Sequence, residues 1–452
     1  MRKIAVIDVG KTNAKLALVE EGSLREISVV TRPNKVLPGP PWPHFDLDGH
    51  WDFFLLNLAE FHANWGVDAI SVTTHGAAAV LLDHAGGLAA PMLDYEHDGP
   101  DDLDAEYNRL RPDFSLTGSP RLPNGLNLGA QLHWMFATDP GLRDRTAHVL
   151  TYPQYWGWRL TGQMACDVSS LGCHTDLWDP WKGQISPLVA RLGLTDKMAS
   201  PRRPDEQLGQ LLPEIAKITG MTTKTPVSVG IHDSNASLYP HLLGRSDPFA
   251  VVSTGTWVVC MAVGGDPITP DPGRDVLVNV SARAEAVPSA RFMGGREYDL
   301  IRQGDNTAPD IMDRADVLQR GLMLLPAVDP GSGPFQGQVM RWTADPATPG
   351  QKALALAWYL ALMTRICLDL TGARGPVIVE GPFARNQDYL DMLSALSSGE
   401  VAVADSATGT SVGATLLCLR HAAPTQTQSV APPTDSASLI TYAKHWHSLT
   451  GR

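Results

Sequence analysis

An aspartate directly after a predicted strand is the side chain best placed for chemistry in this sequence. Residues 227–231 read Val-Ser-Val-Gly-Ile, which is typical of a buried strand, and His232 and Asp233 follow at the start of a predicted helix. The amides and the dipole at a helix N-terminus favour the charged form of a carboxylate. Asp233 is therefore a candidate general base, although a helix cap is a simpler interpretation of the same residue.

Two similar turns, far apart in the chain, have the residue types that bind phosphate. Residues 3–19 predict an apolar strand, a polar turn at Gly10 and a second apolar strand, and residues 250–259 repeat this pattern around Ser-Thr-Gly-Thr. Glycine permits the backbone conformations that such turns need, and turn amides and hydroxyls bind anions. A motif that occurs near the start and again past the middle indicates an internally duplicated, two-lobed fold.

Together these residues suggest phosphoryl transfer, which needs phosphate ligands, a metal anchor and a carboxylate that accepts the proton of the attacking hydroxyl. Asp8, at the end of the first strand, is a candidate Mg²⁺ anchor, either directly or through water. By itself Asp8 fits an ordinary turn residue equally well. The candidate phosphate ligands are the polar residues of the two turns: Thr12, Asn13 and Lys15 in the first, and Thr254, Gly255 and Thr256 in the second.

Composition excludes several other classes of protein. With 452 residues, 43% hydrophobic and 19% charged, the chain is expected to form two or three globular domains. A formal charge of -12 without basic clusters argues against nucleic acid as a partner. The five scattered cysteines argue against a disulfide framework or a zinc site. No apolar run suggests a membrane span or a signal peptide, so we expect no membrane association and a cytoplasmic location.

Strands and helices are predicted to alternate, which is typical of an α/β fold with parallel strands. The predicted helices are 51–65, 101–111, 127–138, 310–320, 353–370, 387–397 and 439–449. Further strands are predicted at 67–73, 79–82, 276–281, 377–380 and 401–404, and loops at 291–299 and 421–437.

Six motifs in order resemble those of the FGGY carbohydrate kinases. They are D-V-G-K-T-N-A-K, T-H-G-A-A-A-V-L-L-D, G-I-H-D-S-N-A, S-T-G-T-W, V-I-V-E-G-P-F-A-R-N and A-T-G-T-S-V-G-A, and they span about residues 3–420. The chain looks most similar to the branch of L-fuculose and L-rhamnulose kinases. The resemblance implies two duplicated ribonuclease-H-like domains of the actin and sugar-kinase superfamily, with an active-site cleft between them. Residues 1–244 would bind the sugar and carry the first phosphate loop and Asp233. Residues 245–452 would carry the second phosphate loop and bind adenosine.

The resemblance also implies roles for individual residues. Asp233 would be the catalytic base, and Asp8 and Asp233 would hold Mg²⁺, directly or through water. The residues implied to bind ATP are Asp8, Gly10, Lys11, Thr12, Asn13, Lys15, Thr254, Gly255, Thr256, Gly381, Pro382 and Asn386, with Gly409 and Gly413. The residues implied to bind the sugar are His75, Gly76, Tyr95, His232 and Asp233.

The sequence departs from the family pattern at several of these positions. Pro382 and Phe383 follow Gly381 where glycines are usual, and Tyr95 replaces a more usual tryptophan. Lys11 stands where a small residue is common, and its side chain either contacts phosphate or is solvated. His75 fits a structural histidine at a strand end as well as a sugar ligand.

The function implied by the resemblance is ATP-dependent phosphorylation of the terminal primary hydroxyl of a ketose, of the L-fuculose or L-rhamnulose type. Three alternatives remain open: a kinase of the same family for a pentulose or a polyol, a pseudokinase that binds nucleotide or sugar without catalysis, and a nucleotide-dependent switch of the actin-like superfamily. The expected partner is a small sugar. A homodimer is possible, but no interface residue can be assigned from the sequence.

Overall fold

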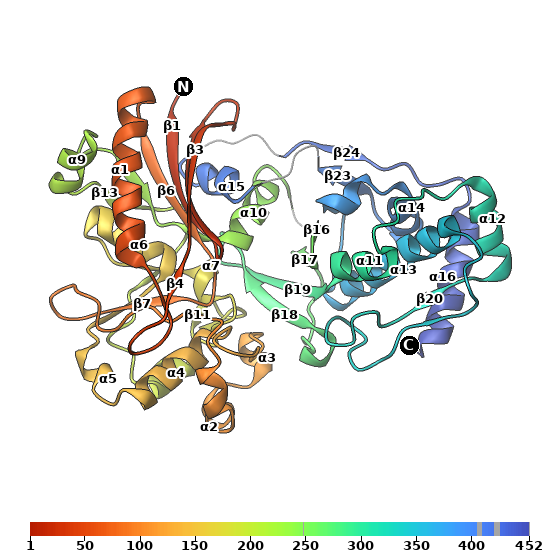
Figure 1. Cartoon of the computed structure of the whole chain (residues 1–452), viewed down its shortest axis with the longest axis horizontal. Coiled ribbons are helices and arrows are strands. Elements are labelled where there is room, and N and C mark those ends of the chain that lie inside the picture. Colours follow the sequence, from red (N-terminus) through yellow and green to blue (C-terminus); the bar gives the residue numbers. More distant parts are fainter. Residues whose placement is uncertain (247, 405–408, 420–424, 452) are drawn as a thin grey trace. The chain divides into compact units, whose positions relative to one another are not determined.

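The computed structural model describes residues 1–246, 248–404, 409–419 and 425–451 (Figure 1). The chain divides into two compact units, and neither is continuous in sequence. Unit 1 comprises 1–244, 278–286 and 408–424, and unit 2 comprises 245–277, 287–407 and 425–452. The first residues of the A-T-G-T-S-V-G-A motif and part of the predicted loop at 421–437 lie outside the described residues.

Unit 1 is built on a seven-stranded sheet with the order β13-β14-β6-β1-β2-β3, to which β15 adds beside β6. Its strands are β1 (Lys3–Val9), β2 (Asn13–Glu20), β3 (Glu26–Pro33), β6 (Ala69–Thr74), β13 (Gln207–Gln210), β14 (Pro226–Ser228) and β15 (Ile231–His232). β1, β2 and β3 pair antiparallel, whereas β6 runs parallel to β1, β14 and β15. The hairpin predicted over 3–19 is confirmed as β1 and β2.

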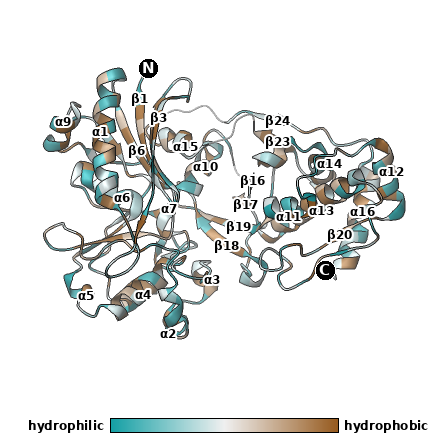
Figure 2. Cartoon of the chain, in the orientation of Figure 1, coloured by the Kyte–Doolittle hydropathy of each residue, from teal (hydrophilic) through white to brown (hydrophobic). Residues whose placement is uncertain are grey.

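Helices cover both faces of this sheet. Ala5, Ile7 and Val9 of β1 belong to the same core as residues of α1 (Leu47–Trp65) and α6 (Tyr152–Thr161), while Asp8 contacts α15 (Thr410–Leu416). Alternate residues of a strand point to opposite faces, so Asp8 faces away from that core. The strands β1 and β6 are mainly apolar in Figure 2, as burial on two faces requires.

The remaining elements of unit 1 are short. The helices are η1 (Gly99–Leu103), α2 (Asp104–Leu110), α3 (Phe114–Thr117), α4 (Leu128–Thr138), α5 (Leu142–Arg145), α7 (Val168–Leu171), α8 (Pro187–Arg191), α9 (Pro213–Thr219) and α10 (Asp233–Leu242). The strands are β4 (Val36–Leu37), β5 (His44–Phe45), β7 (Ala79–Leu82), β8 (His148–Thr151), β9 (Cys166–Asp167), β10 (Trp178–Asp179), β11 (Gln184–Ile185) and β12 (Pro201–Arg202).

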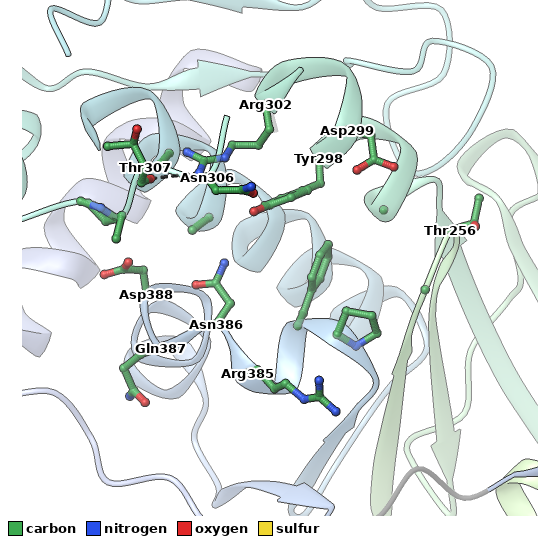
Figure 3. A pocket seen from close by; sticks show the side chains of 18 residues that line it. Thr256, Tyr298, Asp299, Arg302, Asn306, Thr307, Arg385, Asn386, Gln387 and Asp388 are labelled. Carbon is green, nitrogen blue, oxygen red and sulfur yellow. Dashed lines mark hydrogen bonds between the residues drawn. The ribbon is translucent and has the colours of Figure 1, made fainter. Parts of the chain in front are cut away.

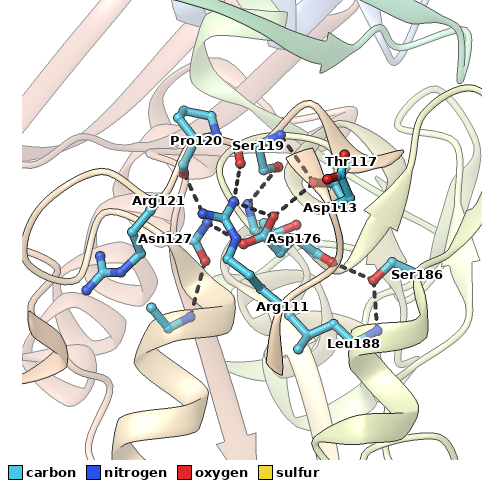
Figure 4. A network of polar contacts seen from close by, with 12 residues as sticks. Arg111, Asp113, Thr117, Ser119, Pro120, Arg121, Asn127, Asp176, Ser186 and Leu188 are labelled. Carbon is cyan, nitrogen blue, oxygen red and sulfur yellow. Dashed lines mark hydrogen bonds and ion pairs between the residues drawn. The ribbon is translucent and has the colours of Figure 1, made fainter. Parts of the chain in front are cut away.

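A buried carboxylate organises the small elements that follow η1 (Figure 4). Asp176 is fully buried and accepts hydrogen bonds from Arg111 Nη2 (2.9 Å), Thr117 Oγ1 (2.9 Å), Tyr107 Oη (2.8 Å) and Asn127 Nδ2 (3.0 Å). A buried charge is tolerated only when it is paired and hydrogen-bonded. Asp176 therefore ties α2, α3 and the start of α4 into one substructure.

Unit 2 repeats the sheet topology of unit 1. Its order is β18-β19-β17-β16-β22-β23-β24, with β16 antiparallel to β17 and parallel to β22. The run β19-β17-β16-β22-β23 thus corresponds to β3-β2-β1-β6-β14, which confirms the predicted duplication. The strands are β16 (Phe249–Thr254), β17 (Val258–Val263), β18 (Val276–Val280), β19 (Ala286–Phe292), β20 (Leu324–Leu325), β21 (Arg341–Trp342), β22 (Val377–Glu380), β23 (Val401–Ala404) and β24 (Thr427–Ser429).

One long helix forms the centre of unit 2. α13 (Pro349–Leu370) is long and apolar enough to cross a membrane, but most of its residues are buried in the core of unit 2. The other helices are η2 (Pro272–Arg274), α11 (Gly294–Arg302), α12 (Ile311–Arg320), η3 (Pro382–Arg385), α14 (Gln387–Leu396) and α16 (Ser436–Thr450). The helices predicted at 310–320, 353–370 and 387–397 are confirmed. The loop predicted at 291–299 is wrong, because these residues form the end of β19 and most of α11.

Candidate active site

Three strands of unit 1 end side by side and deliver the predicted catalytic and sugar residues. In the parallel register Asp8 of β1 lies opposite Thr73 of β6, and His232 of β15 lies opposite Thr74. His75 follows Thr74 directly, and its amide donates to the carbonyl of Val9 at 2.9 Å. Carboxyl ends of neighbouring parallel strands are where ligands bind in α/β sheets. This topology places Asp8, His75 and His232 at one edge of the sheet.

Asp233 begins α10 with one carboxylate oxygen fixed. Oδ1 accepts hydrogen bonds from the amide (2.6 Å) and the hydroxyl (3.3 Å) of Ser234 and lies 3.1 Å from His232 Nε2. Within the described part of the chain, no hydrogen bond involves Oδ2. The side chain is 30% exposed. One oxygen is therefore oriented by the protein and the other is open to a proton donor.

His232 is held on all sides. Its ring is buried, Nδ1 lies 3.3 Å from the side-chain amide of Asn235, and its backbone amide donates to Ser169 Oγ at 3.1 Å. A Cβ atom at Gly76 would lie 2.6 Å from Nε2, so only glycine fits beside the ring. Burial by itself lowers the pKa of His232, but the neighbouring Cys173 and Asp233 more than offset this and raise the pKa. The charged form can then hold the Asp233 carboxylate.

His75 lies within a cluster of aromatic rings. Its ring centroid is 5.2 Å from that of Phe45, 5.0 Å from Tyr95 and 5.1 Å from Tyr152. Nδ1 lies 3.0 Å from the carbonyl of Gly76, whereas Nε2 is buried and has no hydrogen-bond partner among the described residues. Burial lowers the pKa of His75 and raises that of Tyr95. A neutral, unpaired imidazole nitrogen beside aromatic rings suits a sugar hydroxyl.

The first predicted phosphate loop is the turn between β1 and β2. Asp8 Oδ2 accepts a hydrogen bond from Thr410 Oγ1 (2.5 Å) and lies 3.2 Å from the Lys15 ammonium, its cross-strand partner. Among the described residues no three His, Cys, Asp or Glu side chains converge as metal ligands. A Mg²⁺ ion held by one carboxylate, phosphate oxygens and water needs no such cluster, so Asp8 fits a magnesium anchor.

The tip of the same turn is open. The Gly10 amide donates to the carbonyl of Asn13 at 2.9 Å, and a Cβ atom at Gly10 would meet only that oxygen, at 3.6 Å. Thr12 and Asn13 are exposed, as phosphate ligands must be. Lys11 points elsewhere: its ammonium pairs with Asp94 and with Glu96 at 3.1 Å.

The second predicted phosphate loop is the turn between β16 and β17 in unit 2. Thr254 is buried, and its hydroxyl donates to the carbonyl of Glu380 at 2.6 Å. The Gly255 amide donates to the carbonyl of Trp257 at 2.9 Å, and a Cβ atom at Gly255 would meet nothing closer than 3.9 Å. Thr256 is exposed. Thr254 therefore supports the turn, while Gly255 and Thr256 are free to contact phosphate.

A cavity of about 670 Å³ in unit 2 joins this turn to the predicted adenosine motif (Figure 3). Its volume is in the range of ordinary small-molecule sites. Gly255, Thr256, Pro382 and Asn386 line it, as do residues that the sequence did not identify: Tyr298, Asp299, Arg302, Asn306 and Thr307. Figure 3 shows Arg302 and Asn306 across the cavity from Asn386. The missed residues belong to α11 and the following loop, in a region predicted only as a loop and without a recognised motif.

Pro382 and Phe383 leave the cavity open. Gly381 has φ +84° and precedes the 3-10 helix η3, in which Pro382 lines the cavity. Phe383 packs its buried ring against Tyr298 at 6.0 Å between centroids. The side chain of Asn386 caps α14 by accepting the amide of Tyr389 at 3.1 Å. The departure from the glycine-rich pattern is thus built into the wall of the cavity.

The glycines of the last motif lie in unit 1. A Cβ atom at Gly413 would lie 1.7 Å from the carbonyl oxygen of Ala236, so this glycine lets α15 pack closely on α10. Gly409 is exposed at the N-terminus of α15, with open space around it. Gly413 therefore has a packing role in unit 1.

Two family descriptions match the chain. The FGGY family of carbohydrate kinases, N-terminal domain, matches residues 113–239, and Carbohydrate kinase FGGY, C-terminal domain, matches residues 246–428. Among curated proteins, a rhamnulokinase of Yersinia pestis is 24% identical over 291 residues, which cover 59% of this chain and 55% of that protein. A xylulose kinase of Escherichia coli is 26% identical over 267 residues, which cover 55% of this chain and 54% of that protein. The matched region spans about half the length of these curated relatives.

Solved structures cover the whole chain. A carbohydrate kinase from Novosphingobium aromaticivorans is 34% identical, with a TM-score of 0.92 over 99% of this chain and 100% of that one. A gluconate kinase from Lactobacillus acidophilus shares the fold at 13% identity, with a TM-score of 0.78 over 100% of this chain and 98% of that one. The fold, the two family matches and the 34% identity over the full length place this chain in the FGGY family of carbohydrate kinases.

Proposed function

We propose that this protein phosphorylates the terminal primary hydroxyl of a ketose of the L-fuculose or L-rhamnulose type, with ATP as donor. The observation that carries the proposal is the carboxylate of Asp233, which has one oxygen fixed by His232 and Ser234 and the other unpaired. A general base needs this combination of fixed orientation and a free acceptor.

In the proposed reaction the sugar is bound by His75, Gly76, Tyr95 and His232, with its terminal hydroxyl directed at Asp233. Asp233 takes the proton as the hydroxyl oxygen forms its bond to the γ-phosphorus. The bond from that phosphorus to the bridging oxygen breaks, and its electron pair leaves with ADP. The hydrogen bonds to Oδ1 orient the base throughout.

The donor would be held by residues of both units. Thr12, Asn13 and Lys15 are the proposed phosphate ligands of unit 1, and Gly255 and Thr256 those of unit 2. The 670 Å³ cavity beside Pro382 and Asn386 is the proposed adenosine site. Mg²⁺, when bound, neutralises phosphate charge, and Asp8 would anchor it, with Asp233 nearby through water. The open glycine positions in both turns support this assignment.

Other substrates remain open within the family. A pentulose or a polyol would present a similar terminal hydroxyl, and the relatives include a xylulose kinase. A pseudokinase is the remaining alternative, and the free Asp233 oxygen favours catalysis over it. We propose residues 1–244 as the sugar domain and 245–452 as the adenosine domain of a cytoplasmic enzyme without nucleic-acid or membrane partners. A homodimer stays a prediction.

The experiment is a coupled ADP-release assay with Mg²⁺-ATP against L-fuculose, L-rhamnulose, both ribuloses, both xyluloses and glycerol. Asp233→Ala should lower turnover at least about 100-fold. Asp113→Ala is a matched control, because Asp113 also begins a helix and accepts the amide (2.9 Å) and hydroxyl (2.6 Å) of the next-but-one serine, Ser115. It should keep full turnover.

The outcomes separate the alternatives. Turnover with one sugar, lost in Asp233→Ala and kept in Asp113→Ala, would support the proposal and identify the substrate. Sugar-induced thermal stabilisation without turnover would favour the pseudokinase. Equal turnover in Asp233→Ala and in the unchanged protein would refute the role of Asp233.

A further inference from the structure

Lys11 lies in the first phosphate loop by sequence, but its side chain extends to the sugar residues. Its ammonium lies 4.8 Å from the ring centroid of Tyr95 and 5.1 Å from that of Phe45. It pairs with Asp94 and lies 3.1 Å from Glu96 Oε2. Cation–π contact and ion pairing both favour this position over a solvated one. The ammonium is therefore committed to the segment around Tyr95.

This contact fixes the wall of the sugar site. Asp94 is buried, its Oδ1 accepts the amide of Glu96 at 3.2 Å, and its carbonyl accepts the amide of His97 at 3.0 Å, so residues 94–97 form a tight turn. Tyr95 stands in this turn, with its ring 5.0 Å from His75. Because Lys11 binds both the carboxylate that closes the turn and the ring that the turn presents, it sets where Tyr95 lies.

The charges of this cluster select the chemical class of the sugar. The positive charge of Lys11 is matched by Asp94 and exceeded once Glu96 is counted, and Asp233 adds a further carboxylate at the same strand ends. The buried Nε2 of His75 is unpaired, and burial and Lys11 both lower the pKa of this ring, so His75 brings no compensating charge. A sugar acid would meet negative charge without a free cation among these residues, and like charges in contact repel.

The geometry points to Lys11 as a positioning and specificity residue of the sugar site, which with Asp94 and Glu96 restricts this site to neutral sugars. The inference rests on the proposed sugar kinase function and narrows its substrate to ketoses or polyols without a carboxylate. It also separates Lys11 from Lys15, whose ammonium pairs with Asp8 at 3.2 Å in the phosphate loop.

The first test compares Lys11→Met with Lys35→Met, a control at an exposed lysine. Methionine keeps an unbranched stem over the rings and removes the charge. We expect the KM for the ketose to rise at least tenfold in Lys11→Met while the KM for ATP stays within twofold, and Lys11→Arg to recover part of the loss. Lys35→Met should change neither. A change in the KM for ATP alone would overturn the inference, because it would make Lys11 a phosphate ligand.

The second test frees the Lys11 charge with Glu96→Gln and with the double variant Asp94→Asn/Glu96→Gln. Binding of D-gluconate and of L-rhamnulose is measured by calorimetry without ATP. We expect the unchanged protein to prefer the ketose at least about 100-fold, and the variants to bind gluconate at least tenfold more tightly than the unchanged protein. Adding Lys11→Met should cancel that gain. Because Glu96 is 60% exposed, Glu96→Gln is expected to fold even if the double variant does not.

These readouts separate failure of the inference from failure of the proposed function. Ketose preference and gluconate gain without turnover would support the Lys11 inference and refute the kinase activity. Turnover with equal binding of gluconate and ketose, or no gluconate gain in Glu96→Gln and in any folded double variant, would overturn the inference and leave the kinase activity standing.

Discussion

Replacing Gly76 by alanine tests whether the position of His232 matters for activity. A Cβ atom there would lie 2.6 Å from Nε2 and 2.9 Å from Cδ2 of His232, whereas ordinary contacts begin near 3.4 Å. The ring or the Gly76 backbone must therefore shift by about 0.8 Å, the difference between 2.6 and 3.4 Å. The ring is buried and held at Nδ1 by Asn235, so it has little room to yield.

The magnitude follows from the contact that would be lost. His232 Nε2 lies 3.1 Å from Asp233 Oδ1, and a shift of this size takes the pair beyond good hydrogen-bond geometry. A misplacement of about 1 Å in an active site can cost about 100-fold in rate, which corresponds to about 2.7 kcal/mol. Overpacking is also expected to destabilise unit 1 by about 1–3 kcal/mol.

The assay is steady-state kinetics with the panel sugar that gives turnover, together with urea unfolding. We expect kcat/KM for the sugar to fall about 100-fold. Gly331→Ala is the matched control, because its Cβ would meet nothing closer than 3.4 Å and it lies in unit 2. A folded Gly76→Ala protein with kcat/KM within threefold of the unchanged protein would show that the His232 position is not needed.

Three further changes test the packing of each unit. Asp176→Asn should lower the urea-unfolding free energy by about 3 kcal/mol, because Arg111 loses its buried partner, and a loss below about 1 kcal/mol would contradict this reading. Burial raises the pKa of Glu297 from 4.5 to about 7, so stability should fall as pH rises from 4.5 through 7; Glu297→Gln should remove that slope in thermal unfolding. Trp446→Phe should cost about 1–3 kcal/mol in urea unfolding, because it deletes the indole hydrogen bond to the carbonyl of Leu324 at 2.8 Å; an unchanged midpoint would make that bond dispensable.

Local patterns explain why much of the fold could be predicted from the sequence. The two hairpins follow from apolar runs around Gly/Thr turns, and α13 follows from helical periodicity over residues 353–370. Asp233 was identified because the strand that precedes it is continuous and apolar. Each of these signals lies within about twenty residues of sequence, so no tertiary information was needed.

The parts that could not be predicted depend on contacts between distant residues. Thr410 bonds to Asp8 across 402 positions, and nothing near either residue indicates the other. Gly294 and Gly295 suggested a loop, yet they begin α11: a Cβ atom at Gly295 would lie 2.1 Å from the carbonyl oxygen of Gly255, so the glycine serves close packing. The partners of Lys11 lie more than 80 positions away, and its sequence neighbours indicated only phosphate.

The discontinuity of unit 1 has a consequence for synthesis on the ribosome. Residues 1–244 emerge first, but α15 belongs to the same unit and follows more than 160 residues later. Until α15 arrives, Asp8 lacks its Thr410 partner, and Ser71 of β6 lacks the carbonyl of Ala414, to which its hydroxyl donates at 2.7 Å. Domains usually fold as units from the N-terminus during synthesis. Here the nascent N-terminal segment must wait, with one face of its sheet uncovered by α15, so a fragment that stops at Gly244 should not form the complete unit.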